Sequence, residues 1–207
     1  MVSDIIWATI FWDFVMLLAK CSVFIATSLD GFIAKEDGSI DWLMEANNLV
    51  PAGEDGGYKD FIASVDALVM GRHSFEKVLS FEAWPYGSLP VVVMSSQTLE
   101  MPSHLKETVS VTAESPIELV NRLTNKGCKH LYIDGGLTIQ SFIAANLINE
   151  LTITLVPLLL GTGRKLFGPL AHDTPLLHIE TKCLGGGFVQ LRYQIISPEH
   201  TSTALKI

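Results

Sequence analysis

Short apolar runs that end at glycine- or serine-bearing turns recur along the chain, and helical patterns follow the most distinct of them. In the clearest unit the apolar run Leu131–Ile133 stops at Asp134–Gly136, and helical apolar positions follow at Leu137, Phe142 and Ile143. A strand that turns on glycines into a helix leaves free backbone N–H groups and a partial positive charge at the turn, which favours an anion such as phosphate. A tight turn without a ligand explains the two glycines equally well.

A second unit of this kind runs from the apolar run Ala67–Met70 through Gly71–Ser74 into a helical pattern at Phe75, Val78 and Leu79. Other strands and helices are indicated by apolar runs, helical spacing, a capping box and glycine stops. The further predicted strands are Lys20–Ser28, Pro90–Met94, Glu150–Leu160 and a hairpin of Leu176–Leu184 with Phe188–Ile196. The further predicted helices are Tyr58–Val65 and Ser115–Lys126, and Lys35–Gly57 is predicted to be a long loop suited to a mobile lid.

Strands alternate with helices through most of the chain, and a hairpin ends it. This order predicts an α/β fold with a mostly parallel central sheet, helices on both faces and a C-terminal antiparallel hairpin. No repeat or linker interrupts it, so residues 20–207 are predicted to form one domain.

Residues 1–19 form an apolar extension in front of the first strand. Its apolar runs, Ile5–Trp12 and Phe14–Ala19, are separated by Asp13. A membrane anchor is one interpretation, but the run is short and a carboxylate near its middle is costly in a bilayer. We favour an appended helix, or translated upstream sequence in front of the true start.

The composition excludes several functional classes. The chain has 207 residues, of which 48% are hydrophobic and 17% are charged, as expected of a globular protein. Its formal net charge of −8 argues against a nucleic-acid surface, which needs clustered lysine and arginine. The three cysteines are far apart and form no C-x-x-C pair, so neither a metal site nor a disulfide framework is indicated, and a cytoplasmic protein is expected.

Three predicted strands end in turns that suit phosphate: Gly71–Ser74, Ser95–Ser96 and Gly135–Gly136. In an open parallel sheet, ligands bind at the carboxyl ends of the strands, so these turns can line one crevice. The guanidinium of Arg72 and the hydroxyl of Ser74 would add to it, which together suits a dinucleotide. Taken singly, Arg72 can be a surface arginine and Ser74 a helix N-cap.

Several segments resemble known families. Met70–Glu76, Val92–Gln97 and Ile133–Gly136 resemble the dihydrofolate reductase superfamily. Ile25–Gly31 and Asn149–Gly161 resemble the reductase domain of the bifunctional riboflavin-biosynthesis deaminase–reductase and its stand-alone relatives. The resemblance covers about residues 20–196 in the right order, and it implies a dihydrofolate reductase-like fold that binds NADPH.

The resemblance also implies where the cofactor contacts the chain. Ala26, Thr27 and Ile33 would contact the nicotinamide end, and Trp42 would lie on a flexible loop above it. The remaining implied contacts are with the pyrophosphate and the adenosine 2′-phosphate. They come from Gly71, Arg72, His73, Ser74, Ser95, Ser96, Gly135, Gly136, Leu137 and Thr138.

Acidic residues are the candidates for the chemistry. In the riboflavin-pathway reductases an acidic residue before the glycines touches the substrate, and Asp134 matches it; its alternative role is a turn that caps the next helix. Dihydrofolate reductases carry a carboxylate early in the helix after the long loop, for which Asp55 and Asp60 are the nearest candidates. Asp30 is the other acid near the nicotinamide end, or else part of an Asp-Gly turn.

The expected function is therefore an NADPH-dependent reductase of a pyrimidine- or pterin-like substrate, similar to 5-amino-6-(5-phosphoribosylamino)uracil reductase. Dihydrofolate reductase activity and a non-catalytic nucleotide-binding protein are the alternatives, and Lys35 is the one basic residue of the 35–57 loop available for a substrate phosphate. No H-x-E…C-x-x-C motif is present, so no deaminase half is expected. Related proteins commonly pair as homodimers, and the apolar strand Leu151–Leu160 is a candidate to join such an interface.

Overall fold

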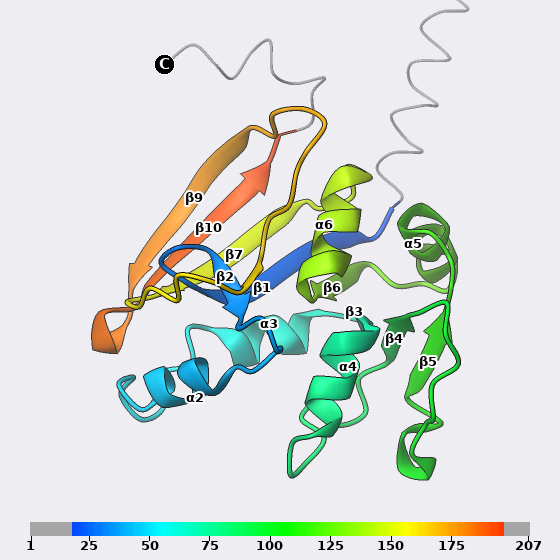
Figure 1. Ribbon diagram of the computed structural model, residues 1–207. Helices are drawn as coiled ribbons and strands as arrows, with labels where there is room; N and C mark the ends of the chain where they lie inside the picture. Colours follow the sequence, from blue (N-terminus) through cyan, green and yellow to red (C-terminus); the bar gives the residue numbers. More distant parts are fainter. Residues whose placement is uncertain (1–17, 197–207) are drawn as a thin grey trace, which may run out of the picture.

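The sheet that runs through the molecule has the strand order β5-β4-β3-β6-β1-β7-β10-β9 (Figure 1). The computed structural model describes residues 18–196, so the predicted extension lies almost entirely outside the described residues. Parallel pairs join β5 through β7 in this order, and β10 pairs antiparallel with both β7 and β9. The predicted mostly parallel sheet with a C-terminal hairpin is confirmed.

The strands of the large sheet are β1 Lys20–Ser28, β3 Ala67–Gly71, β4 Val91–Met94, β5 Val109–Thr112, β6 His130–Asp134, β7 Glu150–Val156, β9 Leu176–Cys183 and β10 Val189–Ile195. A small second sheet pairs β2 Phe32–Ala34 with β8 Arg164–Lys165. The helices are α2 Asp41–Asn47, α3 Tyr58–Ser64, α4 Arg72–Leu79, α5 Pro116–Asn125 and α6 Gly136–Ala144, with short 3-10 turns η1 Ser103–Leu105 and η2 Gly185–Gly187. Within residues 18–196, no helix has the length and apolar character needed to cross a bilayer.

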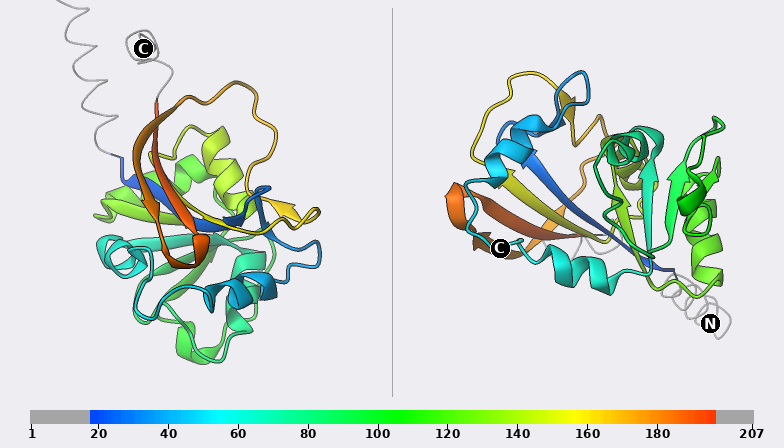
Figure 2. Two further views of the ribbon diagram at one scale, coloured as in Figure 1. Left: turned by 90° about the vertical axis from the view of Figure 1, so that its left-hand side faces the viewer. Right: turned by 90° about the horizontal axis from the view of Figure 1, so that it is seen from below.

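Helices cover both faces of the sheet (Figures 1 and 2). Leu119 of α5 and Phe142 of α6 belong to one buried cluster, whereas Phe75 of α4 belongs to another. Successive side chains of a strand point to opposite faces, so Val69 packs in the first cluster and Leu68 in the second. Strands buried on both faces explain why the runs in the sequence are continuously apolar.

The strand predicted over Glu150–Leu160 is too long, because β7 ends at Val156. Pro157 has no N–H to continue the ladder, and the Leu158 amide turns back to the Val156 carbonyl oxygen at 2.7 Å. The loop predicted over Lys35–Gly57 contains α2, and the strands β2, β5 and β8 were not predicted. Each of these strands is at most four residues long and gives little periodic signal.

The position of β7 limits how the expected homodimer contact could form. β7 lies between β1 and β10, so both of its backbone edges are already paired. Leu151–Val156 therefore has no free backbone edge for strand pairing with a second copy, and the homodimer itself stays a prediction. The edges of this sheet are β5 and β9, and β9 exposes the side chains of Leu176, Leu177 and Ile179.

The segment that follows α2 packs on the tip of the C-terminal hairpin, as Figures 1 and 2 both show. A Cβ at Gly186 would lie 2.6 Å from the carbonyl oxygen of Leu49, and one at Gly185 would collide with Pro51. The Gly185 amide donates a hydrogen bond to Glu54 Oε2 at 3.1 Å. The glycines of η2 are thus required for the close approach of two segments that are far apart in the sequence.

Replacing Phe142 with alanine is expected to lower the free energy of unfolding by about 3–5 kcal/mol, because the side chain is fully buried between α6 and the sheet. Ile117→Ala removes a side chain that is 45% exposed on α5 and should cost less than about 1 kcal/mol. Urea denaturation of both variants measures the difference. Equal losses would contradict the packing described for α6.

Candidate functional site

A cavity of about 1000 Å³ opens at the carboxyl ends of four neighbouring parallel strands. Its lining includes Ala26 of β1, Gly71 at the end of β3, Met94 of β4 and Asp134 at the end of β6. This is the position at which open parallel sheets bind ligands. The small β2–β8 sheet forms another part of the wall.

The helices α4 and α6 both begin at this cavity, and neither has a side-chain cap. The first backbone hydrogen bond of α6 runs from the Ile139 amide to the Gly135 carbonyl oxygen, so the amides of the preceding turn have no partner within the helix. In contrast, α5 begins with the predicted capping box of Ser115 and Glu118, in which Glu118 Oε2 accepts from the Ser115 amide at 2.9 Å. Two helix N-termini are therefore open to an anion in this one cavity.

Glycines bring these two helix starts together. A Cβ at Gly71 would lie 2.8 Å from Thr138 Oγ1, and a Cβ at Gly135 would collide with Ser74 Oγ. Gly135 also has a φ of +88°, a conformation that side chains with a Cβ rarely adopt. The glycines are thus needed for packing of the two turns as well as for access to their amides.

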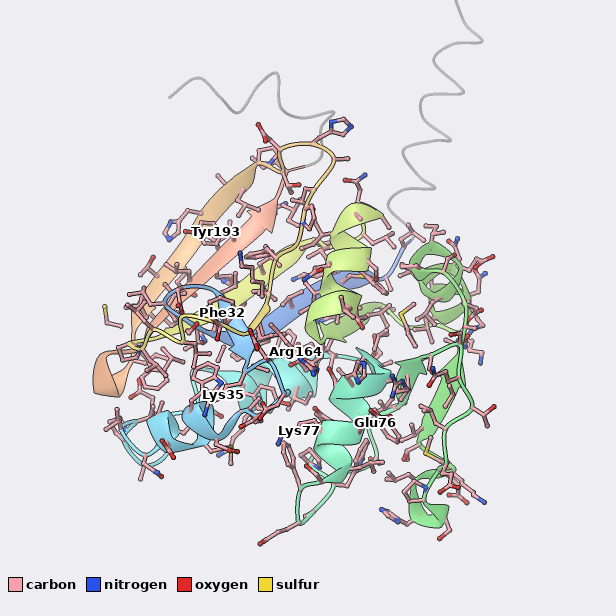
Figure 3. All side chains as sticks on the ribbon, viewed as in Figure 1. Phe32, Lys35, Glu76, Lys77, Arg164 and Tyr193 are labelled. Atoms are coloured by element: carbon pink, nitrogen blue, oxygen red, sulfur yellow. The ribbon has the colours of Figure 1, made fainter. Side chains whose placement is uncertain are left out.

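Cations from separate parts of the chain gather around the cavity. Arg72 and Lys77 come from α4, and Arg164 and Lys165 come from β8. In Figure 3, Lys77 extends from α4 on the side that faces α2, while Arg164 lies near β2. Arg72 pairs with Glu76, but Lys77, Arg164 and Lys165 form no ion pair within residues 18–196. For a chain with a net charge of −8, this is a local concentration of positive charge.

The guanidinium of Arg164 is held in place by the turn before α2. Its Nε donates to the Glu36 carbonyl oxygen at 3.2 Å. A Cβ at Gly38 would lie 3.3 Å from the guanidinium, so glycine at this position leaves room for it.

Asp134 is the carboxylate that lines the cavity. Burial raises its pKa from 3.8 to about 6, although the Gly135 amide and Tyr132 lower it. Burial and, secondly, the charge of Asp134 raise the pKa of Tyr58 to about 12 and raise those of Tyr86 and Tyr132 further. Tyr132 Oη donates to the Phe24 carbonyl oxygen at 2.8 Å, whereas Tyr86 lines the cavity itself. A carboxyl group with a pKa near 6 can hold or release a proton at neutral pH.

Most residues that the sequence assigned to a site line this one cavity. They are Ala26, Ile33, Gly71, Arg72, His73, Ser74, Ser95, Ser96, Asp134, Gly135, Gly136, Leu137 and Thr138.

Thr27 and Trp42 are exceptions. Thr27 is 2% exposed and lies outside the lining, to which its neighbours Ile25 and Ala26 belong. Trp42 is 5% exposed and packs with Val156 and Phe188. Its place in the cavity wall is taken by its neighbours Ile40 and Leu43. Trp42 is therefore a packing residue in this structure and not a lid over a ligand.

Asp30 and Asp55 lie outside the lining and have structural partners. Asp30 Oδ1 accepts from Ser28 Oγ at 2.6 Å and Oδ2 accepts from the Gly161 amide at 2.7 Å. Asp55 accepts from the amides of Gly57 at 2.9 Å and Lys59 at 3.1 Å, at the start of α3. These hydrogen bonds lower the pKa of both carboxyl groups. The structure therefore does not support either residue as a catalytic acid, and Asp60 on α3 is exposed outside the lining as well.

Sequence reasoning missed Lys77, Tyr86, Arg164 and Lys165. Lys77 follows His73 by four residues and so shares its face of α4, a signal that was available. Arg164 and Lys165 follow Gly163, a glycine that the structure requires because a Cβ there would collide with the Ala34 carbonyl oxygen. Nothing near these two residues in the sequence indicates which elements they face.

Comparisons with known proteins agree with this geometry. The family model described as RibD C-terminal domain matches residues 19–188. The Bacillus subtilis (strain 168) protein YwjB is 38% identical over 178 residues, covering 84% of this chain and 97% of that protein. A crystal structure from Shewanella sp. PV-4, of a protein provisionally named for riboflavin biosynthesis, is 39% identical with a TM-score of 0.79 and covers 86% of this chain and 99% of that one.

A more distant structure shows the fold. Dihydrofolate reductase from Enterococcus faecalis, solved in complex with NADP(H), is 17% identical with a TM-score of 0.59, covering 87% of this chain and 99% of that one. The predicted dihydrofolate reductase-like fold is confirmed.

Replacing Asp134 with asparagine is expected to stabilise the folded protein above about pH 6. Because burial raises the pKa of Asp134, the folded state binds its proton more tightly than the unfolded chain does, and stability falls as the pH rises from about 4 to about 6. The asparagine variant does not lose stability in this way. We therefore expect its free energy of unfolding to exceed that of the wild type by about 1–2 kcal/mol at about pH 7.5 and to equal it below about pH 4. Urea unfolding at both pH values measures it.

Asp30→Asn is the matched control. The pKa of Asp30 is lowered, chiefly by the Ser28 hydroxyl, so its contribution to stability is present at neutral pH and is lost on acidification. The asparagine change should therefore destabilise the protein at neutral pH. If Asp134→Asn instead lowers the free energy of unfolding equally at both pH values, Asp134 only forms a turn.

Proposed function

The chain belongs to the RibD C-terminal domain family, and on that premise we propose that it is an NADPH-dependent reductase of a pyrimidine- or pterin-like heterocycle. The observation that carries the proposal is the pair of uncapped helix N-termini, of α4 and α6, at one cavity with four cationic side chains. A dinucleotide with several phosphate groups fits this arrangement better than a neutral ligand does.

The residues present fit the cofactor along its length. The amides of Gly135 to Thr138 would hold the pyrophosphate, and Arg72 with Ser95 and Ser96 would hold the adenosine 2′-phosphate. Ala26 and Ile33 offer an apolar surface for the nicotinamide. When bound, NADPH would supply a hydride to the acceptor.

Asp134 has the position and the pKa for the proton that must accompany the hydride. It lies at the end of β6, directly before the uncapped start of α6. Burial and, secondly, the charge of Asp134 raise the pKa of Tyr86, which lines the same cavity. With a pKa of about 6, its carboxyl group would hydrogen-bond a ring nitrogen or amino group of the acceptor and exchange a proton with it. Enclosure by Phe81, Tyr86 and Leu43 would exclude water from this end.

The cavity also bears on the choice of acceptor. The segment Lys35–Gly57 has no basic residue besides Lys35, so by itself it offers little to bind the phosphate of a substrate such as 5-amino-6-(5-phosphoribosylamino)uracil. Lys77 extends from α4 on the side that faces α2, and Arg164 is held by the turn before α2. Neither has an ion-pair partner among the described residues. They would bind the phosphate that the loop itself cannot, and this supports the riboflavin-pathway type of substrate.

Turnover of that compound with NADPH is the first test. We expect the wild-type protein to oxidise NADPH when the uracil is added, and Asp134→Asn to lower kcat by at least about a hundredfold because a positioned proton donor is lost. The dissociation constant of NADPH should change by less than about threefold. Absorbance at the nicotinamide band and calorimetry measure these quantities.

The alternatives separate in the same experiment. NADPH binding without turnover of the uracil or of dihydrofolate would favour a non-catalytic nucleotide-binding protein. Turnover of dihydrofolate alone would favour dihydrofolate reductase activity. Binding of neither NADPH nor NADH would remove the proposal.

Lys77→Ala is expected to lower kcat/KM about tenfold for the phosphorylated uracil, because a charge-assisted contact with phosphate is lost from a partly exposed wall. The corresponding compound without its phosphate should react equally well with both proteins. Lys35→Ala serves as the control, since Lys35 lies outside the large cavity in a small surface hollow. An equal loss for both compounds would show that Lys77 does not read the phosphate.

A further inference from the structure

Three side chains form a ring on the first turns of α4, at the edge of the cavity. Arg72 Nη1 donates to Glu76 Oε1 at 2.7 Å, and His73 Nδ1 lies 3.5 Å from Glu76 Oε2. Arg72 Nη2 lies 3.3 Å from His73 Nε2, which closes the ring. Arg72 and His73 line the cavity, whereas Glu76 does not.

The protonation of the ring follows from its donors. The guanidinium of Arg72 has only donors, so His73 Nε2 must accept from it. In the tautomer that accepts at Nε2, the ring N–H is at Nδ1, which lies 3.5 Å from Glu76 Oε2. The hydrogen bond from Arg72 lowers the pKa of Glu76, so its carboxylate is ionised at neutral pH. The guanidinium is therefore held from two sides, by Glu76 and by His73.

Helix stability does not account for this ring. A cation in the first turn and an anion one turn later oppose the helix dipole, and this order is the weaker one for an i, i+4 pair. The first turn of α4 contains no acidic residue. In α5 the order is the favourable one, with Glu118 in the first turn and Arg122 in the last. In addition, the Arg72 and Glu76 side chains are 29% and 47% exposed, a setting in which ion pairs add little.

We propose that Glu76 is a positioning residue for Arg72, and that it sets the preference of the cavity for a nucleotide with a phosphate on its adenosine ribose. This rests on the proposed function, in which Arg72 meets that phosphate. A guanidinium plane fixed through Nη1 and Nη2 keeps its other N–H groups in the fork that matches two phosphate oxygens. In Figure 3, Glu76 and Lys77 lie on different sides of α4, so Glu76 can hold Arg72 without entering the cavity.

Two effects oppose each other when Glu76 is changed. Its negative charge repels a phosphate, but the side chain is nearly half exposed and salt screens such a repulsion. Its hydrogen bond orders the long Arg72 side chain before the ligand binds. The entropy cost that is thereby removed from binding corresponds to about two- to tenfold in affinity. We therefore expect a change of Glu76 to weaken NADPH binding, because the loss of the fixed Arg72 orientation outweighs the relief of the repulsion between Glu76 and the phosphate.

The test is the ratio of the dissociation constants of NADH and NADPH, measured by calorimetry at one salt concentration. Glu76→Ala is expected to lower this ratio about two- to tenfold through weaker NADPH binding, with NADH binding unchanged, and Glu76→Gln to lower it less. In an Arg72→Ala background only the screened repulsion is left to relieve, so Glu76→Ala should no longer lower the ratio and should leave it unchanged or raise it slightly. A merely structural role would weaken both nucleotides alike.

Glu114→Gln is the matched control, because it removes one negative charge from an Arg–Glu pair outside the cavity, that of Glu114 and Arg122 at 2.7 Å. It should leave the ratio unchanged. A ratio that stays the same or rises in Glu76→Ala overturns the proposal for Glu76 alone, as does a wild-type ratio near one. Wild-type protein that binds neither nucleotide overturns the proposed function together with it.

Discussion

The site depends on one close contact, between the first turns of α4 and α6. Because β3 and β6 are adjacent parallel strands, the turns that follow them start side by side. Only glycine fits where they meet: Gly71 faces Thr138, and Gly135 faces Ser74. Two sets of backbone amides without helical partners consequently face the same cavity, and the cations, the buried carboxylate and the small β2–β8 sheet are arranged around them.

Charge placement follows from this contact. An acidic chain can attract a polyanion only where its cations are concentrated, and the cations that line this cavity come from α4 and β8. Arg72 stands at the positive end of a helix dipole, which costs α4 a few tenths of a kcal/mol and adds to the positive potential of the cavity. Asp134 lies at the border of that region, and its burial keeps its pKa near 6 instead of near 4.

The wall opposite α4 depends on the C-terminal hairpin. Ile40 and Leu43 of this wall belong to the segment around α2, whose continuation packs on the glycines of η2 through Leu49 and Pro51. Trp42 anchors the same segment from the inside, against Val156 and Phe188. The hairpin, which contributes no side chain to the cavity, thereby supports the end at which an acceptor would bind.

The sequence alone determined the long elements, because apolar runs, helical spacing and the Ser115–Glu118 capping box are local signals. It also identified the strand-end turns at Gly71 and Gly135, because a glycine that directly follows an apolar run is a local signal of a tight turn. Tertiary structure alone decided which side chains face the cavity. It brought Lys77 and Arg164 to one cavity, turned Trp42 into the core and gave Asp30 and Asp55 structural partners. These outcomes depend on contacts between residues far apart in the chain, and burial and hydrogen bonding of that kind leave no periodic pattern in the sequence.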